Sequence, residues 1–169
     1  INSLGNRIHY LGYGYCNGYG EADGHPTDGL VVDYASGASM LVRREVFERI
    51  GFFRNDYLIY YDDMEFCWRA RIAGFNIGLV ESSVCRHKYE FRTRLPQLYH
   101  LQRNRLVTLL TMERLGTLLL IAPCLLVSEA LLLGEPYNRT HPDRLTRGSH
   151  HVLSIQLPNA LYDCARAAC

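Results

Sequence analysis

The hydrophobic positions along this chain switch between helical and extended spacing. Three segments repeat apolar residues at the spacing of an α-helix: Arg44–Ile50, Asp62–Ala73 and Gln97–Met112. Gly51 and Gly74 follow the first two, at the position where glycine accepts a left-handed backbone at little cost. In the first segment Arg44 and Glu48 are one turn apart and suited to an ion pair. We therefore predict three helices.

Short apolar runs between these segments predict β-strands, at Leu30–Tyr34, Met40–Val42, Phe75–Val80 and Val84–His87. Earlier in the chain, residues 5–24 interleave glycines with tyrosines, which favours turns and short irregular strands. That region is either a surface loop or an aromatic lid that stacks on a sugar or a base. Strands that alternate with helices indicate the mixed α/β class.

A later stretch, Leu115–Ser128, carries no charge and lies between Arg114 and Glu129. It is shorter than the roughly 20 residues that cross a bilayer, unless Glu129 is tolerated and the run extends to Leu133. We expect an interfacial or buried helix, kinked at Pro123. Residues 136–169 have weak periodicity and offer no identifiable chemistry.

Composition narrows the function. A chain of 169 residues that is 48% hydrophobic and 21% charged can bury a core. A net charge of +1 gives no general reason to bind nucleic acid. The six cysteines form no CxxC pair, and several lie in apolar segments, which predicts buried thiols in a reducing, cytoplasmic compartment. The chain opens at Ile1 rather than Met, so we expect an upstream part to be missing, and no signal-like segment directs secretion.

Chemistry is concentrated at the start of the second helix. Asp62 and Glu65 fit a capping box, and Asp63 would lie in the first turn, where the helix dipole favours an anion. Alternatively, Asp63 faces a cleft and takes a proton from an attacking hydroxyl. A carboxylate stabilised by a helix N-terminus would be a modest base.

One set of residues resembles a known family in order and spacing: Tyr34–Arg44, Phe47, Gly51–Phe53, Tyr60–Glu65, Arg69, Gly74, His87 and Arg103–Asn104. The chain is similar here to the C-terminal half of family 2 glycosyltransferases, the rhamnosyltransferase-like, inverting GT-A group. The resemblance covers roughly residues 1–112. It implies a partial GT-A domain that lacks its N-terminal nucleotide-binding half (1–112), then an apolar helix (113–135) and a tail (136–169).

The resemblance also implies an activity. Such enzymes transfer a sugar from a nucleotide-diphosphate donor to a hydroxyl of a saccharide or lipid-linked acceptor, with inversion. The catalytic base falls on Asp63, and Asp62 stands where the family has Glu. His87 corresponds to a ligand of the divalent metal, Mn²⁺ or Mg²⁺, beside the donor diphosphate. A strand-end histidine can equally be structural.

Further residues take expected roles from the same resemblance. The small turn Gly37-Ala38-Ser39 would lie near the donor sugar, and Tyr60 and Tyr61 would line the acceptor site. Arg86 and Lys88 would contact phosphate oxygens or form a solvated rim. From the residues alone, Phe66 and Trp68 are expected in the core. Arg69 is expected to pair with a nearby acid and hold its helix in place.

Two departures from the family matter. Phe53-Arg54-Asn55 stands where the family commonly has Phe-Asp-Glu, and no Asp-x-Asp of a nucleotide-binding half is present, so this stretch alone is expected to be inactive. Two other functions remain open. One is a non-catalytic carbohydrate-binding or membrane-tethering module, and the other is a metal-binding module that uses Cys85 and His87. For the enzyme, we expect the cytoplasmic face of a membrane.

Overall fold

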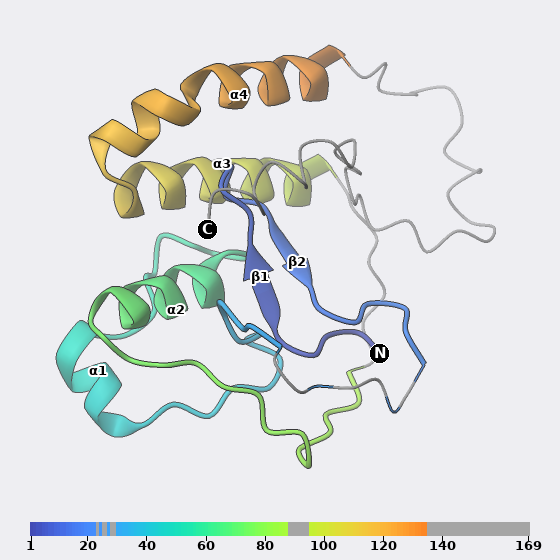
Figure 1. Ribbon diagram of the computed structural model, residues 1–169. Coiled ribbons are helices and arrows are strands. Elements are labelled where there is room, and N and C mark those ends of the chain that lie inside the picture. The colour runs from blue at the N-terminus through green and yellow to red at the C-terminus, as the bar shows by residue number, and fades with distance from the viewer. Residues whose placement is uncertain (23, 25–26, 28–29, 88–94, 135–169) are drawn as a thin grey trace. The chain divides into compact units, whose positions relative to one another are not determined.

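The computed structural model describes residues 1–134 except positions 23, 25–26, 28–29 and 88–94. Its elements are strands β1 (Asn6–Ile8) and β2 (Gly14–Cys16) and helices α1 (Arg44–Ile50), α2 (Asp62–Ile72), α3 (Leu95–Met112) and α4 (Leu115–Gly134), shown in Figure 1. The three predicted helices are confirmed with ends within two residues. Lys88 and the tail 136–169 lie outside the described residues. Residues 1–130 form one compact unit, to which the following description applies.

The glycine-rich N-terminal region folds into an antiparallel hairpin, in agreement with the short strands predicted there. Asn6 of β1 faces Cys16 of β2 and also forms an isolated bridge with Tyr34. The carboxylate of Asp33 accepts hydrogen bonds from the backbone N–H of Ile8, from Arg7 and from Arg71 of α2. The hairpin is thereby tied to α2.

The other predicted strands were wrong. Met40–Val42, Phe75–Val80 and Val84–His87 are irregular, and Leu30–Tyr34 contributes only the bridge at Tyr34. A strand needs a neighbour that satisfies its backbone N–H and C=O groups. Val80 and Val84, at 63% and 80% exposed, are not covered on a sheet face. Among the described residues, these runs pair with no strand, apart from the bridge between Tyr34 and Asn6 of the hairpin.

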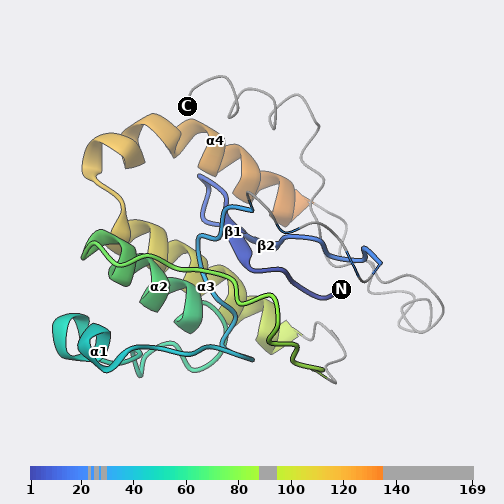
Figure 2. The same cartoon turned by 60° about the horizontal axis from the view of Figure 1, so that its bottom comes forward.

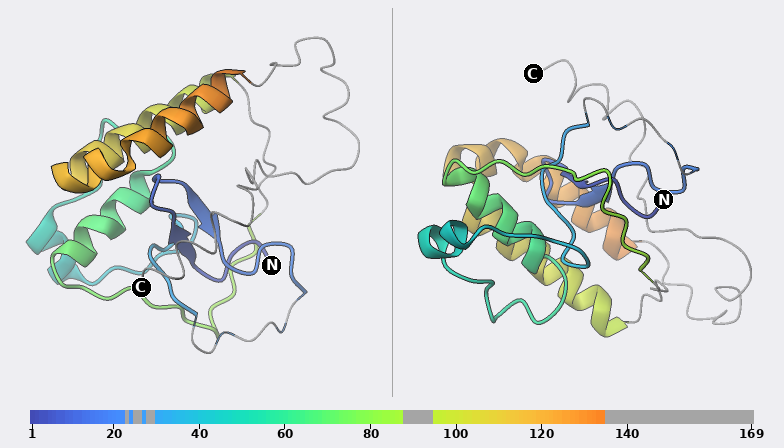
Figure 3. Two further views of the ribbon diagram at one scale, coloured as in Figure 1. Left: turned by 45° about the horizontal axis from the view of Figure 1, so that its top comes forward. Right: turned by 90° about the horizontal axis from the view of Figure 1, so that it is seen from below.

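Helix α2 lies between α1 and α3, as the views in Figures 2 and 3 agree. On the α1 side, Phe66 packs with Val46 and Ala70, so the prediction that Phe66 is a core residue is confirmed. Trp68 is half-buried and packs against a second cluster. A third cluster contains Tyr34, Tyr57, Tyr61, Met64 and Cys67.

The cysteines contradict the prediction of buried thiols. Of the four in the described residues, Cys67 is buried and Cys16, Cys85 and Cys124 are exposed. Burial raises the pKa of the Cys67 thiol to about 11, which keeps it protonated. A missing strand accounts for the exposure of Cys85, which lies on an irregular surface segment, whereas Cys16 lies on β2 and Cys124 on α4.

An arginine fixes α2 in this arrangement, as predicted. Arg69 donates to both carboxylate oxygens of Glu65, at 2.7 and 2.9 Å. The same guanidinium donates to the carbonyl oxygens of Ile50, the last residue of α1, and of Phe52 just beyond it. Gly51 lies between them with φ of 79°, so the predicted helix stop is confirmed.

Candidate functional site

Asp63 is held by two backbone donors at the start of α2. The Gly37 N–H donates to its Oδ2 at 2.8 Å, and the Met64 N–H donates to its Oδ1 at 2.8 Å. Each carboxylate oxygen keeps a second lone pair that can accept a proton. The residue is half-buried, so the carboxylate is oriented yet reachable.

Burial raises the pKa of Asp63 above that of an ordinary carboxyl group, and the Asp62 carboxylate adds to the rise. The hydrogen bonds from Gly37 and Met64 oppose this rise without cancelling it. The expected modest basicity is therefore corrected. Desolvation outweighs the stabilisation that the helix N-terminus gives the anion, and Asp63 is a stronger base than its position in sequence suggests.

The predicted capping box does not form. The N-cap residue of α2 is Tyr61, whose side chain makes no capping hydrogen bond. Glu65 is fully buried and engaged by Arg69, so its carboxylate does not reach back to the N-cap. A buried carboxylate gains more from a bidentate guanidinium than from one backbone N–H. Asp62 lies in the first turn and is half-buried.

The chain enters α2 through two consecutive left-handed residues. Tyr60 has φ of 65° and Tyr61 has φ of 67°, in a region that side chains with a Cβ seldom adopt. In the part of the chain that is described, they are the residues other than glycine with positive φ. This double bend turns the chain so that Asp62 and Asp63 begin the helix.

The two tyrosine side chains differ in accessibility. Tyr61 is 9% exposed and belongs to the tyrosine-rich cluster, so its ring has little surface for the acceptor contact predicted for it. Tyr60 is half-buried and packs against that cluster. Burial raises the pKa of both Tyr34 and Tyr61, and the nearby Asp63 carboxylate contributes to each rise. The candidate base therefore borders a layer of neutral phenols.

The small turn and the candidate base come together, although their positions are 26 residues apart. Ser39 N–H donates to the Ser36 carbonyl, and Ala38 N–H donates to the Ser36 hydroxyl. A Cβ added at Gly37 would lie 3.6 Å from the Cβ of Asp63. The turn thus contacts the carboxylate directly, whereas its predicted approach to a donor sugar stays a prediction.

Arg86 and His87 lie on the exposed segment after α2. Their predicted roles toward phosphate and metal stay predictions, and Lys88 falls outside the described residues. Across those residues, no group of three or more His, Cys, Asp or Glu side chains is placed to hold a metal ion. The Cys85 and His87 alternative consequently gains no third ligand here.

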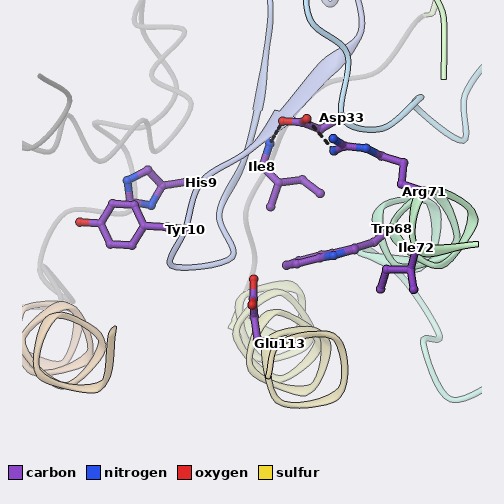
Figure 4. A pocket seen from close by; sticks show the side chains of 8 residues that line it. All are labelled: Ile8, His9, Tyr10, Asp33, Trp68, Arg71, Ile72 and Glu113. Carbon is purple, nitrogen blue, oxygen red and sulfur yellow. Dashed lines mark hydrogen bonds and ion pairs between the residues drawn. The ribbon is translucent and has the colours of Figure 1, made fainter. Parts of the chain in front are cut away.

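A hollow of about 410 Å³ lies elsewhere in the unit (Figure 4). Trp68 and Arg71 reach it from α2, and Glu113 reaches it from beyond the end of α3. Its remaining lining residues are Ile8, His9, Tyr10, Asp33 and Ile72. Neither Asp62 nor Asp63 lines it, so the hollow is separate from the candidate site.

Arg103 and Asn104 have roles that the sequence did not reveal. The Asn104 amide donates to the carbonyl oxygens of Ile59 and Tyr60, at 2.8 and 2.9 Å. Arg103 donates to the Asp56 carbonyl and to Asn104 Oδ1. These two residues belong to the family-like pattern, but the pattern does not reveal that they join α3 to the bend before α2.

Comparisons with known proteins agree with the glycosyltransferase class and go no further. Over 47 residues, 28% of this chain, the sequence is 45% identical to the low-salt glycan biosynthesis hexosyltransferase Agl10 of Haloferax volcanii. The chain spans about 15% of that relative's length. No family model matches, and no solved structure matches. Over this stretch the chain is similar to a glycosyltransferase.

Proposed function

We propose that this chain is the acceptor-side part of an inverting GT-A hexosyltransferase that uses a nucleotide-diphosphate sugar. The observation that carries the proposal is the Asp63 carboxylate. It is half-buried, aligned by two backbone N–H groups, and has a raised pKa at the start of α2. The partial likeness to a hexosyltransferase supports the same class.

In the proposed reaction, Asp63 accepts the proton of the acceptor hydroxyl as its oxygen bonds to the anomeric carbon. The bond from that carbon to the diphosphate oxygen breaks on the opposite face, and the nucleoside diphosphate leaves with the electron pair. Inversion follows from this single displacement. A carboxylate with a raised pKa accepts the proton of the attacking hydroxyl more readily than an ordinary carboxylate does. Asp62 contributes to that rise through its charge.

A divalent metal fits this chain incompletely. The described residues supply no three-ligand group, so His87 would be one ligand among others from outside them. When bound, such a metal would neutralise the departing diphosphate.

The apolar helix supports a membrane-proximal location for the proposed enzyme. Over Leu115–Leu132, α4 is long and apolar enough to cross a membrane by length and composition, and it is largely exposed. Its charged residue, Glu129, pairs with the buried Arg105. Ile121 packs with Leu109 and Leu11. We propose that α4 lies along the cytoplasmic face of the membrane with its leucines toward lipid.

The base assignment is tested with Asp63→Asn in the complete enzyme. The amide keeps the shape of the side chain but cannot accept a proton. We expect turnover of a hexose nucleoside diphosphate to fall by about 10²–10⁴-fold, measured as released nucleoside diphosphate. Asp56→Asn is the matched control, because that carboxylate is exposed in the preceding loop. Near-normal turnover in a folded Asp63→Asn enzyme would refute the base.

A non-catalytic carbohydrate-binding or membrane-tethering module on the same scaffold is the second candidate, and the apolar, largely exposed α4 favours tethering. It predicts saccharide binding without turnover in the wild type.

A further inference from the structure

The left-handed backbone of Tyr60 and Tyr61 before α2 must be stabilised by contacts with another part of the chain. Two successive residues with side chains adopt positive φ, and such residues persist only where their surroundings impose the conformation. Neither Tyr60 nor Tyr61 is glycine, so the backbone gains nothing from intrinsic preference. The N-cap residue, Tyr61, makes no side-chain capping hydrogen bond to the first turn of α2. Local sequence therefore does not account for the geometry at the start of this helix.

Helix α3 stabilises this bend through the buried side-chain amide of Asn104. Asn104 is fully buried, and its Nδ2 donates to two successive carbonyls, those of Ile59 and Tyr60. The side-chain amide has two N–H donors, and both are used on this bend. The amide is buried, so relaxing the bend would leave its two N–H donors without partners, which is costly.

The amide is itself oriented. Arg103 donates to Asn104 Oδ1 at 2.6 Å and to the Asp56 carbonyl at 3.0 Å, so the oxygen and nitrogen ends of the amide have distinct partners. Thr108 donates to the Asn104 carbonyl one turn later on α3. Rotation of the amide would place Nδ2 against a guanidinium and Oδ1 against carbonyl oxygens.

We infer that Asn104 is a positioning residue for the proposed base, because it fixes the left-handed Tyr60-Tyr61 bend that sets where α2 begins. This inference rests on the proposed function. Asp63 lies two residues beyond the bend, and its hydrogen bond to Gly37 N–H requires that the helix start at this place. A shift of about 1 Å at a catalytic group is enough to cost about 10²-fold in rate.

The test uses Asn104→Ala in the complete enzyme, with Tyr57→Phe as the matched control. Tyr57 bonds to Thr108 of α3 from the same loop, at 2.9 Å, but does not contact the carbonyls of the bend. We expect kcat of Asn104→Ala to fall at least tenfold while the KM for the donor changes less than twofold. Tyr57→Phe should keep kcat within twofold. A merely structural loss would affect both variants alike.

A structural readout separates this inference from the proposed function. Backbone NMR couplings report φ for Tyr60 and Tyr61, which should leave the positive region in Asn104→Ala and keep it in Tyr57→Phe. Persistence of positive φ in the folded Asn104→Ala variant would overturn the inference. So would unchanged kcat after the bend has relaxed. An inactive wild type refutes the function instead, and the couplings still decide the anchoring.

If Asn104→Ala does not fold, Asn104→Gln carries the same test. The longer side chain keeps the amide donors but displaces them by one methylene group. The same loss of kcat and of positive φ is expected. Retention of both by a folded Asn104→Gln variant would overturn the inference.

Discussion

At the scale of single residues, Asp63 shows how proton affinity and stability oppose each other. Burial raises its pKa, so the folded chain binds this proton more tightly than the unfolded chain does. Between the ordinary carboxyl pKa, about 3.9, and the higher folded-state pKa, the folded state therefore holds more protons. Stability must fall as pH rises through that window, and the penalty persists at neutral pH.

Between pH 3 and pH 7 the unfolding temperature of Asp63→Asn should accordingly rise relative to that of the wild type, because the neutral amide avoids the desolvation of an anion. The amide nitrogen leaves one of the two backbone N–H donors without an acceptor at either pH, so this loss does not affect the comparison between pH values. The gain from avoided desolvation should vanish near pH 3, where the aspartate is protonated in both states. Thermal unfolding followed by circular dichroism at both pH values measures it. Asp56→Asn is the control of opposite sign, since the Arg54 guanidinium lowers the pKa of that exposed carboxyl. An equal gain for Asp63→Asn at both pH values would contradict the linkage.

At the scale of elements, α2 depends on the ion pair between Glu65 and Arg69. Glu65 is fully buried, and the Arg69 guanidinium also donates to backbone carbonyls at the end of α1 and just after it. Arg69→Leu would leave a buried carboxylate without its partner. We expect a loss of about 3–5 kcal/mol in the free energy of unfolding, measured by urea titration.

The matched control for that loss is Arg44→Leu on α1. Arg44 and Glu48 have the same four-residue spacing, but their side chains are 91% and 60% exposed. Because solvent screens exposed pairs, this variant should lose no more than about 0.5 kcal/mol. Similar losses for the two variants would show that burial of Glu65 is unimportant.

Locality explains which elements could be predicted from the sequence. The pattern and stops of α1 and α2 are contained within a dozen residues, and both helices were predicted. Strands such as Val84–His87 depend on a distant neighbour, and the structure provides none within the described residues. The capping box failed for a related reason, because Arg69 competes for Glu65. Local patterns do not reveal such competition.

The candidate site divides in the same way. Asp63 was predicted from its place before an aromatic-rich helix and from a family-like pattern. Its hydrogen bond from Gly37 joins positions 26 residues apart, and the hydrogen bond from Asn104 to the Tyr60 carbonyl joins positions 44 residues apart. Both contacts join a side chain to a backbone atom, for which the partner's residue type carries no information. Coordinates were needed to find them.

At the scale of the whole molecule, α4 joins a packed face to an apolar exposed face. Ile121 is buried against Leu109, and Glu129 pairs with Arg105 on the packed side. The outward leucines include Leu119 and Leu126, at 68% and 71% exposed. A helix that crossed a bilayer would have to release Arg105 and carry Glu129 into hydrocarbon. Packing therefore favours a helix that stays on the protein, and the proposed contact with lipid would involve its exposed side.

Leu119→Ser combined with Leu126→Ser tests this arrangement through binding to lipid vesicles. Burial of a leucine side chain contributes about 1.5–3 kcal/mol, so losing two partly inserted leucines should weaken partitioning at least tenfold. The unfolding temperature should change little, because neither side chain is buried in the core. Sedimentation with vesicles that contain anionic lipids measures the binding.

Leu110→Ser is the control, since Leu110 is a leucine of α3 that is 63% exposed. It should leave vesicle binding unchanged if α4 alone faces lipid. Equal losses of vesicle binding in the α3 and α4 variants would indicate that exposed leucines bind lipid wherever they lie on the protein. Binding that resists both changes, and also survives carbonate extraction, would mean that α4 leaves its packed face and spans the bilayer. The ion pair of Glu129 with Arg105 would then have to break in the membrane-bound protein.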